Sequence, residues 1–229
     1  MDQRPDPPYF DPTIAGAELT ALVRAADLNM MAARPALVAR LKALIADARK
    51  AARARLDIDG DGAFCAVGLS VFTDALIVLV HDLTVRHAHP PTTATPPARM
   101  AIVATGGYGR GRLAPRSDID LLFLLPSKQT PRGESVVEFM LYLLWDLGLK
   151  VGHATRTVDQ SVRLALDDIT IRTALLDSRF ILGDRALADE LEGRYASDVV
   201  KGTTRAFIEA KLDERDHRLD RTGESRYRV

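Results

Sequence analysis

Apolar residues recur at helical spacing in the first part of the chain. Between Pro35 and Lys50 they fall three and four positions apart, with charged residues on the opposite face, and Pro35 is expected in the first turn of this helix. A second apolar segment, from Phe64 to about Val85, is also predicted to be helical. Together these segments predict a helical N-terminal flank. An extended arm is expected before it, because prolines crowd the first dozen residues.

The pattern changes after a proline-rich segment at 87–97. Short β-capable runs then alternate with longer apolar segments, and Gly148 is expected to end one of the helices. The predicted strands are 100–105, 119–125 and 150–158, the predicted helices are 134–147, 161–176 and 203–221, and 179–182 is either extended or the end of a helix. The predicted fold class is therefore α+β, with a small mixed β-sheet core, the helical N-terminal flank and C-terminal helices.

Three regions are expected along the chain. Residues 1–97 form the proline-rich arm and helical flank, 98–200 form the core, and 201–229 form a charged helical tail. The sequence stops at SRYRV without the composition of a terminus. We therefore expect a fragment of a longer protein, with further domains downstream.

Composition narrows the function classes. The 229 residues carry 31 basic and 31 acidic side chains, and this balance argues against a protein that coats nucleic acid. The single cysteine, Cys65, excludes an internal disulfide and fits a reducing cytoplasm. No uninterrupted apolar run approaches the roughly 20 residues of a membrane span, and the polar N-terminus is unlike a secretory signal. We expect a cytoplasmic protein with no membrane and no nucleic-acid partner.

Candidate chemistry is concentrated between Gly106 and Asp120. Alternate side chains of a strand share a face, so Asp118 and Asp120 are expected to project together while Ile119 points into the core. Two adjacent carboxylates oppose each other's ionisation unless a cation lies between them. Mg²⁺ commonly binds a few carboxylates together with substrate phosphates. The pair predicts a metal site.

A glycine turn precedes this pair. Gly106 and Gly107 follow a predicted strand and precede a short helix, so backbone N–H groups there can approach an anion. A glycine pair or a DxD pair alone is usually just a turn. Together, at one sheet edge, they predict a phosphate cradle beside a metal, as nucleotidyl transfer requires.

The stretch ATGGYGRGRLAPRSDIDLLFLLP resembles the signature of the polymerase-β-type nucleotidyltransferase superfamily, in the form found in bacterial PII uridylyltransferase/uridylyl-removing enzymes. The segments LLWDLGLKVGHATRT, ALLDSRFILGD, FIEAKLDERDHR and GESRYRV are also similar to that family. The resemblance is therefore expected to run from about residue 100 to the end, with little contribution from the helical flank.

The resemblance implies a specific reaction. UMP would pass from UTP to a tyrosine of a PII nitrogen-signalling protein, with release of pyrophosphate, Mg²⁺ or Mn²⁺ as cofactor, and glutamine control. Asp118 and Asp120 would be catalytic and carry the metal. The implied nucleotide-binding residues are Gly106, Gly107, Tyr108, Gly109, Arg110 and Ser117. Ser117 could equally cap a turn, and Arg110 could equally be a solvated loop residue.

Several points stay open at this stage. The superfamily commonly has a third carboxylate, for which Asp159 and Asp177 are candidates, the latter equally a partner of Arg179. An adenylyltransferase, a sensor-coupled nucleotidyltransferase and a catalytically weak nucleotide-binding regulatory fragment remain alternatives. His81-Asp82 imitates an HD phosphohydrolase site, but no histidine precedes it, so uridylyl removal is expected to be absent from this chain. The Asp-rich segment 57–62 is interpreted as a polar turn.

Overall fold

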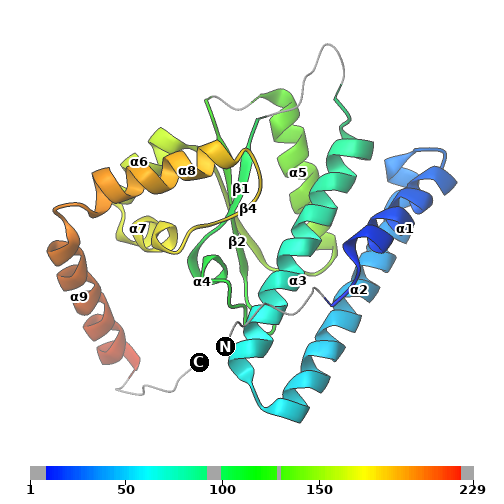
Figure 1. Cartoon of the computed structure of the whole chain (residues 1–229). Helices are drawn as coiled ribbons and strands as arrows, with labels where there is room; N and C mark the ends of the chain where they lie inside the picture. The colour runs from blue at the N-terminus through cyan, green and yellow to red at the C-terminus, as the bar shows by residue number, and fades with distance from the viewer. Residues whose placement is uncertain (1–8, 92–98, 128–129, 223–229) are drawn as a thin grey trace.

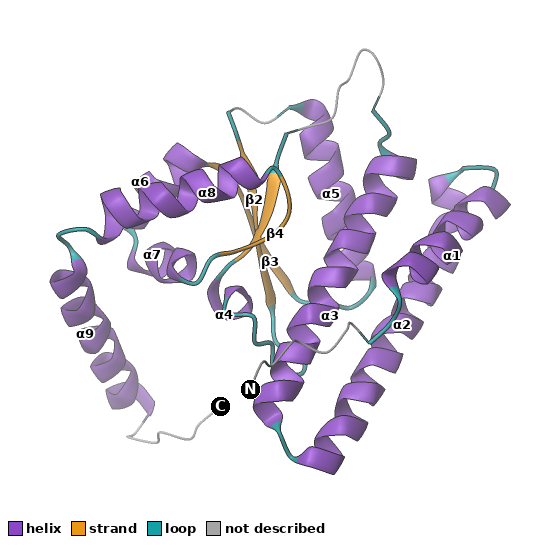
Figure 2. Ribbon diagram, in the orientation of Figure 1, coloured by secondary structure: helices purple, strands orange, loops and turns teal. Residues whose placement is uncertain are grey.

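A central β-sheet lies between two groups of helices in the computed structural model, which describes residues 9–91, 99–127 and 130–222 (Figures 1 and 2). The strands are β1 (Ala101–Ala104), β2 (Ile119–Leu125), β3 (Val151–Thr157) and β4 (Arg179–Gly183). Within the described residues they form a four-stranded sheet in the order β3-β2-β1-β4. The α+β class is confirmed.

The sheet is mixed because its connections differ in length. β1 pairs antiparallel with both β2 and β4, while β2 and β3 run parallel, joined through helix α5 (Pro131–Asp146). A parallel pair needs such a crossover. α5 begins three residues before its predicted start, since Thr130 accepts a hydrogen bond from Gly133 N and caps it. Gly148, at φ 76°, follows its end as predicted.

Alternate residues of β2 supply two hydrophobic clusters. Leu121 and Phe123 belong to a cluster shared with the N-terminal helices and α5, whereas Leu122 and Leu124 belong to one shared with the C-terminal helices. All four are 2% exposed or less. β2 is therefore buried on both faces and fixes the position of the residues at its start.

The N-terminal flank contains α1 (Pro12–Ala25), α2 (Met30–Asp59) and α3 (Gly62–Leu83), followed by a π-helical turn, Thr84–Ala88. The predicted start of α2 at Pro35 is wrong. Asn29 accepts hydrogen bonds from Met31 N and Ala32 N, and this cap starts the helix ahead of the proline. The predicted arm, the first dozen residues, extends one residue too far, because α1 begins at Pro12. Residues 1–8 of the arm lie outside the described part of the chain.

Helix 62–88 is long and apolar enough, by length and composition, to cross a membrane, with a mean hydropathy of 2.3 over its best window. The sequence analysis missed this because it counted only uninterrupted apolar runs. However, 56% of that window is buried inside the protein, and α3 contacts α1, α2 and α5. A buried core helix passes the same test, so this single span is weak support for a membrane segment.

The predicted single helix at 161–176 is two helices, α6 (Val158–Asp167) and α7 (Ile169–Leu176). Asp168 has an extended backbone, and its carboxylate accepts hydrogen bonds from Thr170 N and Ile171 N, so it ends one helix and caps the next. β4 confirms the extended alternative for 179–182. The sequence analysis did not predict α8 (Arg185–Arg194), which is followed by a π-helical segment, Tyr195–Val200.

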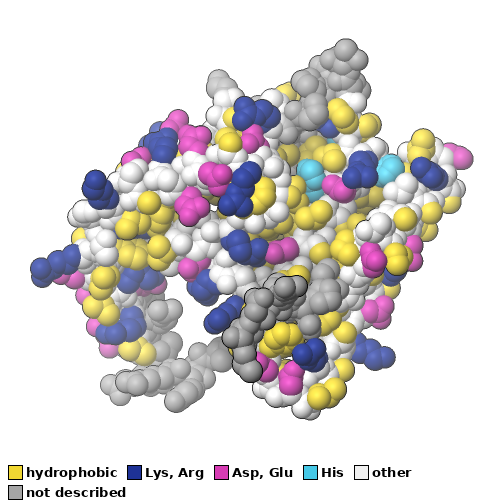
Figure 3. Space-filling model, viewed as in Figure 1, with side chains coloured by type: hydrophobic (Ala, Val, Ile, Leu, Met, Phe, Trp, Pro, Cys, Tyr) yellow, Lys and Arg dark blue, Asp and Glu magenta, His cyan; other side chains and the backbone are white. Residues whose placement is uncertain are grey.

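The charged tail forms helix α9 (Thr204–Thr222), as predicted, at the end of the C-terminal helices (Figure 1). Acidic and basic side chains lie interspersed over the face drawn in Figure 3. In the segment 57–62, Asp57 and Asp59 pair with Arg53 and Arg55, and Asp61 caps α3. These contacts match the polar-turn interpretation.

Candidate active site

The Asp120 carboxylate is packed between two glycines from different elements. Gly106 opens the short helix α4 (Gly106–Gly109), and Gly152 lies opposite Asp120 in the β2–β3 register. A β-carbon placed on Gly106 would lie 3.2 Å from Asp120 Oδ2, and one placed on Gly152 would lie 2.4 Å from Oδ1. The structure thus brings the glycine turn and the carboxylate together, as the sequence predicted.

Asp118 and Asp120 stand at the start of β2 in different surroundings. Asp118 precedes the strand and is 65% exposed, with Oδ1 3.8 Å from Lys150 Nζ. Asp120 is half-buried, and its pKa is raised, first by burial and then by the charge of Asp118. A bound cation would lower the cost of holding both groups ionised. The pair therefore has the electrostatic character of a cation site.

The backbone of α4 offers hydrogen-bond donors beside this pair. The first N–H groups of any helix have no acceptor within it, and Thr105, the residue before α4, makes no side-chain cap. Gly106 has φ +56°, which lets the chain turn directly against Asp120. The N–H groups of Gly106 and Gly107 are therefore suited to an anion held next to the carboxylates.

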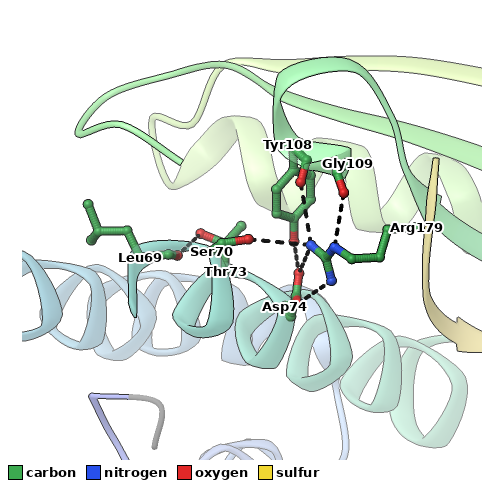
Figure 4. A network of polar contacts seen from close by, with 7 residues as sticks. All are labelled: Leu69, Ser70, Thr73, Asp74, Tyr108, Gly109 and Arg179. Carbon is green, nitrogen blue, oxygen red and sulfur yellow. Dashed lines mark hydrogen bonds and ion pairs between the residues drawn. The ribbon is translucent and has the colours of Figure 1, made fainter. Parts of the chain in front are cut away.

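Tyr108 and Gly109 both make close contacts inside the protein. The Tyr108 side chain is completely buried and points toward α3, where its hydroxyl donates to Asp74 Oδ1 at 2.5 Å (Figure 4). A β-carbon on Gly109 would lie 1.8 Å from the carbonyl oxygen of Asp177. The Tyr108 side chain is thus a core group rather than a nucleotide contact, and Gly109 is needed for close backbone packing.

Arg110 and Ser117 lie on the exposed loop between α4 and β2. Arg110 Nη1 donates to Asp177 Oδ2 at 2.9 Å, and its Nη2 would lie 3.6 Å from a β-carbon on Gly107. The guanidinium is therefore next to the glycine turn. Ser117 N donates to Ala114 O at 3.1 Å, as in the turn that was its alternative interpretation.

The residues of the candidate site also lie in the part of the chain that matches a known protein family. Residues 96–180 match the family model described as a nucleotidyltransferase domain, and this stretch contains the glycine turn and both aspartates. This part of the chain is therefore similar to nucleotidyltransferase domains. The chain is 49% identical over 220 residues to the bifunctional uridylyltransferase/uridylyl-removing enzyme of Rhodopseudomonas palustris. The aligned residues make up 96% of this chain and 24% of that protein.

Two other relatives carry the same name and match the chain at a similar identity. A protein of the same name from Azospirillum brasilense is 53% identical over 194 residues, 85% of this chain and 21% of the relative. One from Bradyrhizobium sp. strain ORS 278 is 49% identical over 220 residues, 96% of this chain and 24% of the relative. The chain thus spans about a quarter of the length of these relatives. The resemblance is confirmed, but its expected extent was too small, because the match also includes the helical flank.

The two candidates for a third carboxylate both pair with arginines. Asp159 lies on α6, is 83% exposed and pairs with Arg194 of α8. Asp177 ends α7 and pairs with Arg110 rather than with Arg179. Among the described residues, no group of three or more His, Cys, Asp or Glu side chains could hold a metal. Neither candidate is thus left as an unpaired carboxylate.

The HD-like pair lies on α3, outside residues 96–180. His81 Nδ1 is 3.6 Å from Asp82 Oδ1, and burial lowers the pKa of the imidazole. Asp82 also lines a groove of about 770 Å³ between α1 and α3, whose lining includes no residue of 106–120. The groove between α1 and α3 is thus separate from the glycine turn and the two aspartates.

Sequence reasoning missed Asp74 and underestimated Arg179. Arg179 on β4 pairs with Asp74 on α3 through Nη1 at 2.6 Å and Nη2 at 3.0 Å. Asp74 stands within an apolar helical segment, where a charged residue is costly to bury without a partner. That isolated charge was the available signal, although the sequence does not identify its partner.

Proposed function

We propose that this chain transfers UMP from UTP to a tyrosine hydroxyl of a PII signalling protein and releases pyrophosphate, using Mg²⁺ or Mn²⁺. The single observation that carries the transferase proposal is the Asp120 carboxylate held between Gly106 and Gly152 next to Asp118. The uridylyl group is proposed because the relatives are named uridylyltransferases. PII is proposed as the acceptor from the family resemblance. A cytoplasmic location is proposed from the single, buried Cys65.

The residues at the site fit a divalent metal. Asp118 and Asp120 supply hard oxygen ligands, and the raised pKa of Asp120 reflects burial and a like charge that a cation would relieve. Two protein carboxylates leave room for phosphate oxygens and water in the coordination of Mg²⁺. Such an ion, when bound, neutralises charge on the triphosphate and favours attack by a hydroxyl.

The chain's own groups orient the nucleotide. The N–H groups at the start of α4 bind phosphate oxygens, and the Arg110 guanidinium beside Gly107 adds a positive charge at the turn. The Asp120 carboxylate fits here because Gly152 leaves space for its Oδ1 and Gly106 leaves space for its Oδ2. The sheet holds Asp120 in place before substrate arrives, which favours the alignment that phosphoryl chemistry requires.

The test is labelling of a purified PII protein. The full 229-residue chain is incubated with Mg²⁺, the PII protein and UTP or ATP labelled in the α-phosphate. Label is expected from UTP, and Asp118→Asn and Asp120→Asn are each expected to reduce its transfer at least 100-fold. Asp189→Asn is the matched control, because Asp189 is an exposed acid on α8 paired with Arg185.

Each other result overturns a different part of the proposal. Transfer from ATP but not UTP would make the domain an adenylyltransferase. Equal transfer by the Asp118→Asn/Asp120→Asn double variant would remove the metal assignment. Binding of UTP without transfer from either nucleotide would indicate a regulatory nucleotide-binding fragment.

A further inference from the structure

A polar cluster joins the helical flank to the glycine turn. It consists of Asp74 on α3, Tyr108 on α4 and Arg179 on β4 (Figure 4). Asp74 Oδ1 accepts the Tyr108 hydroxyl at 2.5 Å and Arg179 Nη2 at 3.0 Å, while its Oδ2 accepts Arg179 Nη1 at 2.6 Å. Asp74 is thus the common acceptor of the cluster.

Arg179 extends the cluster to the backbone of the turn. Its Nε donates to Gly109 O at 3.3 Å, and its Nη2 reaches Tyr108 O at 3.5 Å. The guanidinium carbon lies 5.5 Å from the centre of the Tyr108 ring. The last carbonyl groups of α4 and its one large side chain are therefore held by Asp74 and Arg179 together.

The turn needs such support because its own sequence favours many conformations. Three of the four residues of α4 are glycine, which loses more backbone entropy than any other residue on ordering. A single helical turn also gains little from its own hydrogen bonds. External contacts must therefore fix its geometry, and the Asp74 cluster supplies those of Tyr108 and Gly109.

The cluster is partly shielded from water. Tyr108 is fully buried, and the side chains of Asp74 and Arg179 are 26% and 31% exposed. The pKa of Tyr108 is raised well above its ordinary value, first by burial and then by the charge of Asp74, so its hydroxyl stays a hydrogen-bond donor. Loss of the Asp74 charge would leave Arg179 partly buried without its counter-ion.

We propose that Asp74 is a positioning residue of the transferase site, which holds the phosphate-binding turn beside Asp120 through Tyr108 and Arg179. This proposal rests on the proposed function. Asp74 lies outside residues 96–180, the segment that matches the nucleotidyltransferase family model. The helical flank therefore contributes to the site, and the geometry of the turn depends on a residue outside the segment that matches the family model.

Two conservative variants test the proposal in the full chain. Asp74→Asn removes the charge and Tyr108→Phe removes only the hydroxyl. Thr73→Val is the matched control, because Thr73 neighbours Asp74 on α3, is buried, and its hydroxyl donates to Leu69 O of its own helix rather than to the turn (Figure 4). All variants are compared at the same interval below their melting temperatures.

The first measurement is residue-resolved hydrogen exchange without nucleotide. The reporters are the amides of Gly109 and Gly111, which donate to Thr105 O at 3.0 Å and Tyr108 O at 3.1 Å and so close the turn. We expect exchange at both to be at least 10-fold faster in Asp74→Asn and Tyr108→Phe, and unchanged in Thr73→Val. The second measurement is steady-state transfer, in which KM for UTP is expected to rise about 10-fold while KM for the PII acceptor stays the same.

The two measurements separate the possible failures. Equal exchange at Gly109 and Gly111 in all proteins overturns the positioning role, whether or not transfer is observed. Faster exchange in a protein that transfers no nucleotide leaves the positioning of the turn in place and overturns the proposed function instead. Equal rises of both KM values would indicate general loosening and would also overturn the proposal. If Asp74→Asn does not fold, Tyr108→Phe alone decides.

Discussion

Gly152 lies directly opposite Asp120 in the parallel pairing of β2 and β3, and a β-carbon there would lie 2.4 Å from Asp120 Oδ1. Real β-carbons do not approach an oxygen so closely, so any other residue at 152 must displace the carboxylate or the strand. The glycine on β3 is thus a geometric requirement of the aspartate on β2.

Gly152→Ala is therefore expected to reduce nucleotide transfer at least 10-fold, because the new β-carbon must displace the Asp120 carboxylate or the strand. Gly193→Ala is the control, since Gly193 lies on α8 with no atom within 4 Å of a new β-carbon. This change is expected to leave transfer unchanged and to raise stability by up to about 1 kcal/mol through helix propensity. Transfer rates and urea unfolding check both, and an unchanged rate for Gly152→Ala would contradict the geometry.

The ionised Asp120 carboxylate is expected to lower the free energy of unfolding when no metal is bound. Its pKa is raised in the folded protein, by burial and then by Asp118, so the folded state favours the protonated form. The protonated Asp120 side chain therefore favours the folded state at low pH. This stabilisation is lost as the pH rises through the raised pKa. In a chelating buffer, Asp120→Asn should be more stable than the wild type at pH 7, and the difference should vanish near pH 3.

Urea unfolding at the two pH values measures this effect. Asp189→Asn, at an exposed ion pair, should show no comparable gain at pH 7. A wild type that is more stable than Asp120→Asn at pH 7 without metal would contradict the prediction.

Metal should stabilise the folded wild type by mass action. At Mg²⁺ concentrations about 10 times the dissociation constant, the expected gain in the free energy of unfolding is about 1.4 kcal/mol. The Asp118→Asn/Asp120→Asn double variant should gain nothing, because both proposed ligands are gone. Melting temperatures across a Mg²⁺ titration check this, and an equal shift in both proteins would place the bound metal elsewhere.

Asp168 separates α6 from α7, and its carboxylate accepts two backbone N–H groups of the second helix. Asp168→Ala is expected to lower the free energy of unfolding by about 1 kcal/mol, the usual cost of a lost N-cap. Nucleotide transfer should stay unchanged, because Asp168 contacts neither the turn nor the aspartates. Asp167→Ala, one residue earlier and equally exposed, controls for the loss of an acid, and equal unfolding curves for the two variants would contradict the capping role.

Local sequence patterns were sufficient for β1, β2 and β3 and for the approach of the glycine turn to Asp120. Residues 121–125 are a continuous apolar run, and Asp118 and Asp120 lie just before it, on one face by the period of two along a strand. The glycine turn follows β1 directly, so its approach to Asp120 needs only the antiparallel pairing of β1 with β2. Each of these relationships joins residues that are close in sequence.

The remaining features depend on contacts between distant segments. The Asp74–Arg179 pair joins residues 105 positions apart, and no pattern near either residue identifies the other. The same holds for Tyr108, whose position within the glycine signature indicated a nucleotide contact, although its side chain lies in the core. The starts of α2 and α7 were missed for a local reason, since apolar periodicity was given more weight than the capping residues Asn29 and Asp168.

The last prediction concerns the contribution of Arg110 to nucleotide binding. Its guanidinium pairs with Asp177 at 2.9 Å and reaches the region of Gly107, while its side chain is 60% exposed and free to meet a phosphate. A charged hydrogen bond is worth about 1.5–3 kcal/mol, which corresponds to a rise of roughly 10- to 100-fold in KM for UTP in Arg110→Gln. Arg112→Gln is the matched control, since Arg112 is also exposed on the same loop.

Asp177→Asn completes this experiment. It keeps Arg110 but removes the carboxylate that holds it, so KM for UTP should rise less than in Arg110→Gln and kcat should change little. Steady-state kinetics at two salt concentrations separate a direct phosphate contact from a general field, because only the latter is strongly screened by salt at an exposed site. If Arg112→Gln raised KM as much as Arg110→Gln, the loop would act through its total charge, and the specific position of Arg110 beside Gly107 would have no part in binding.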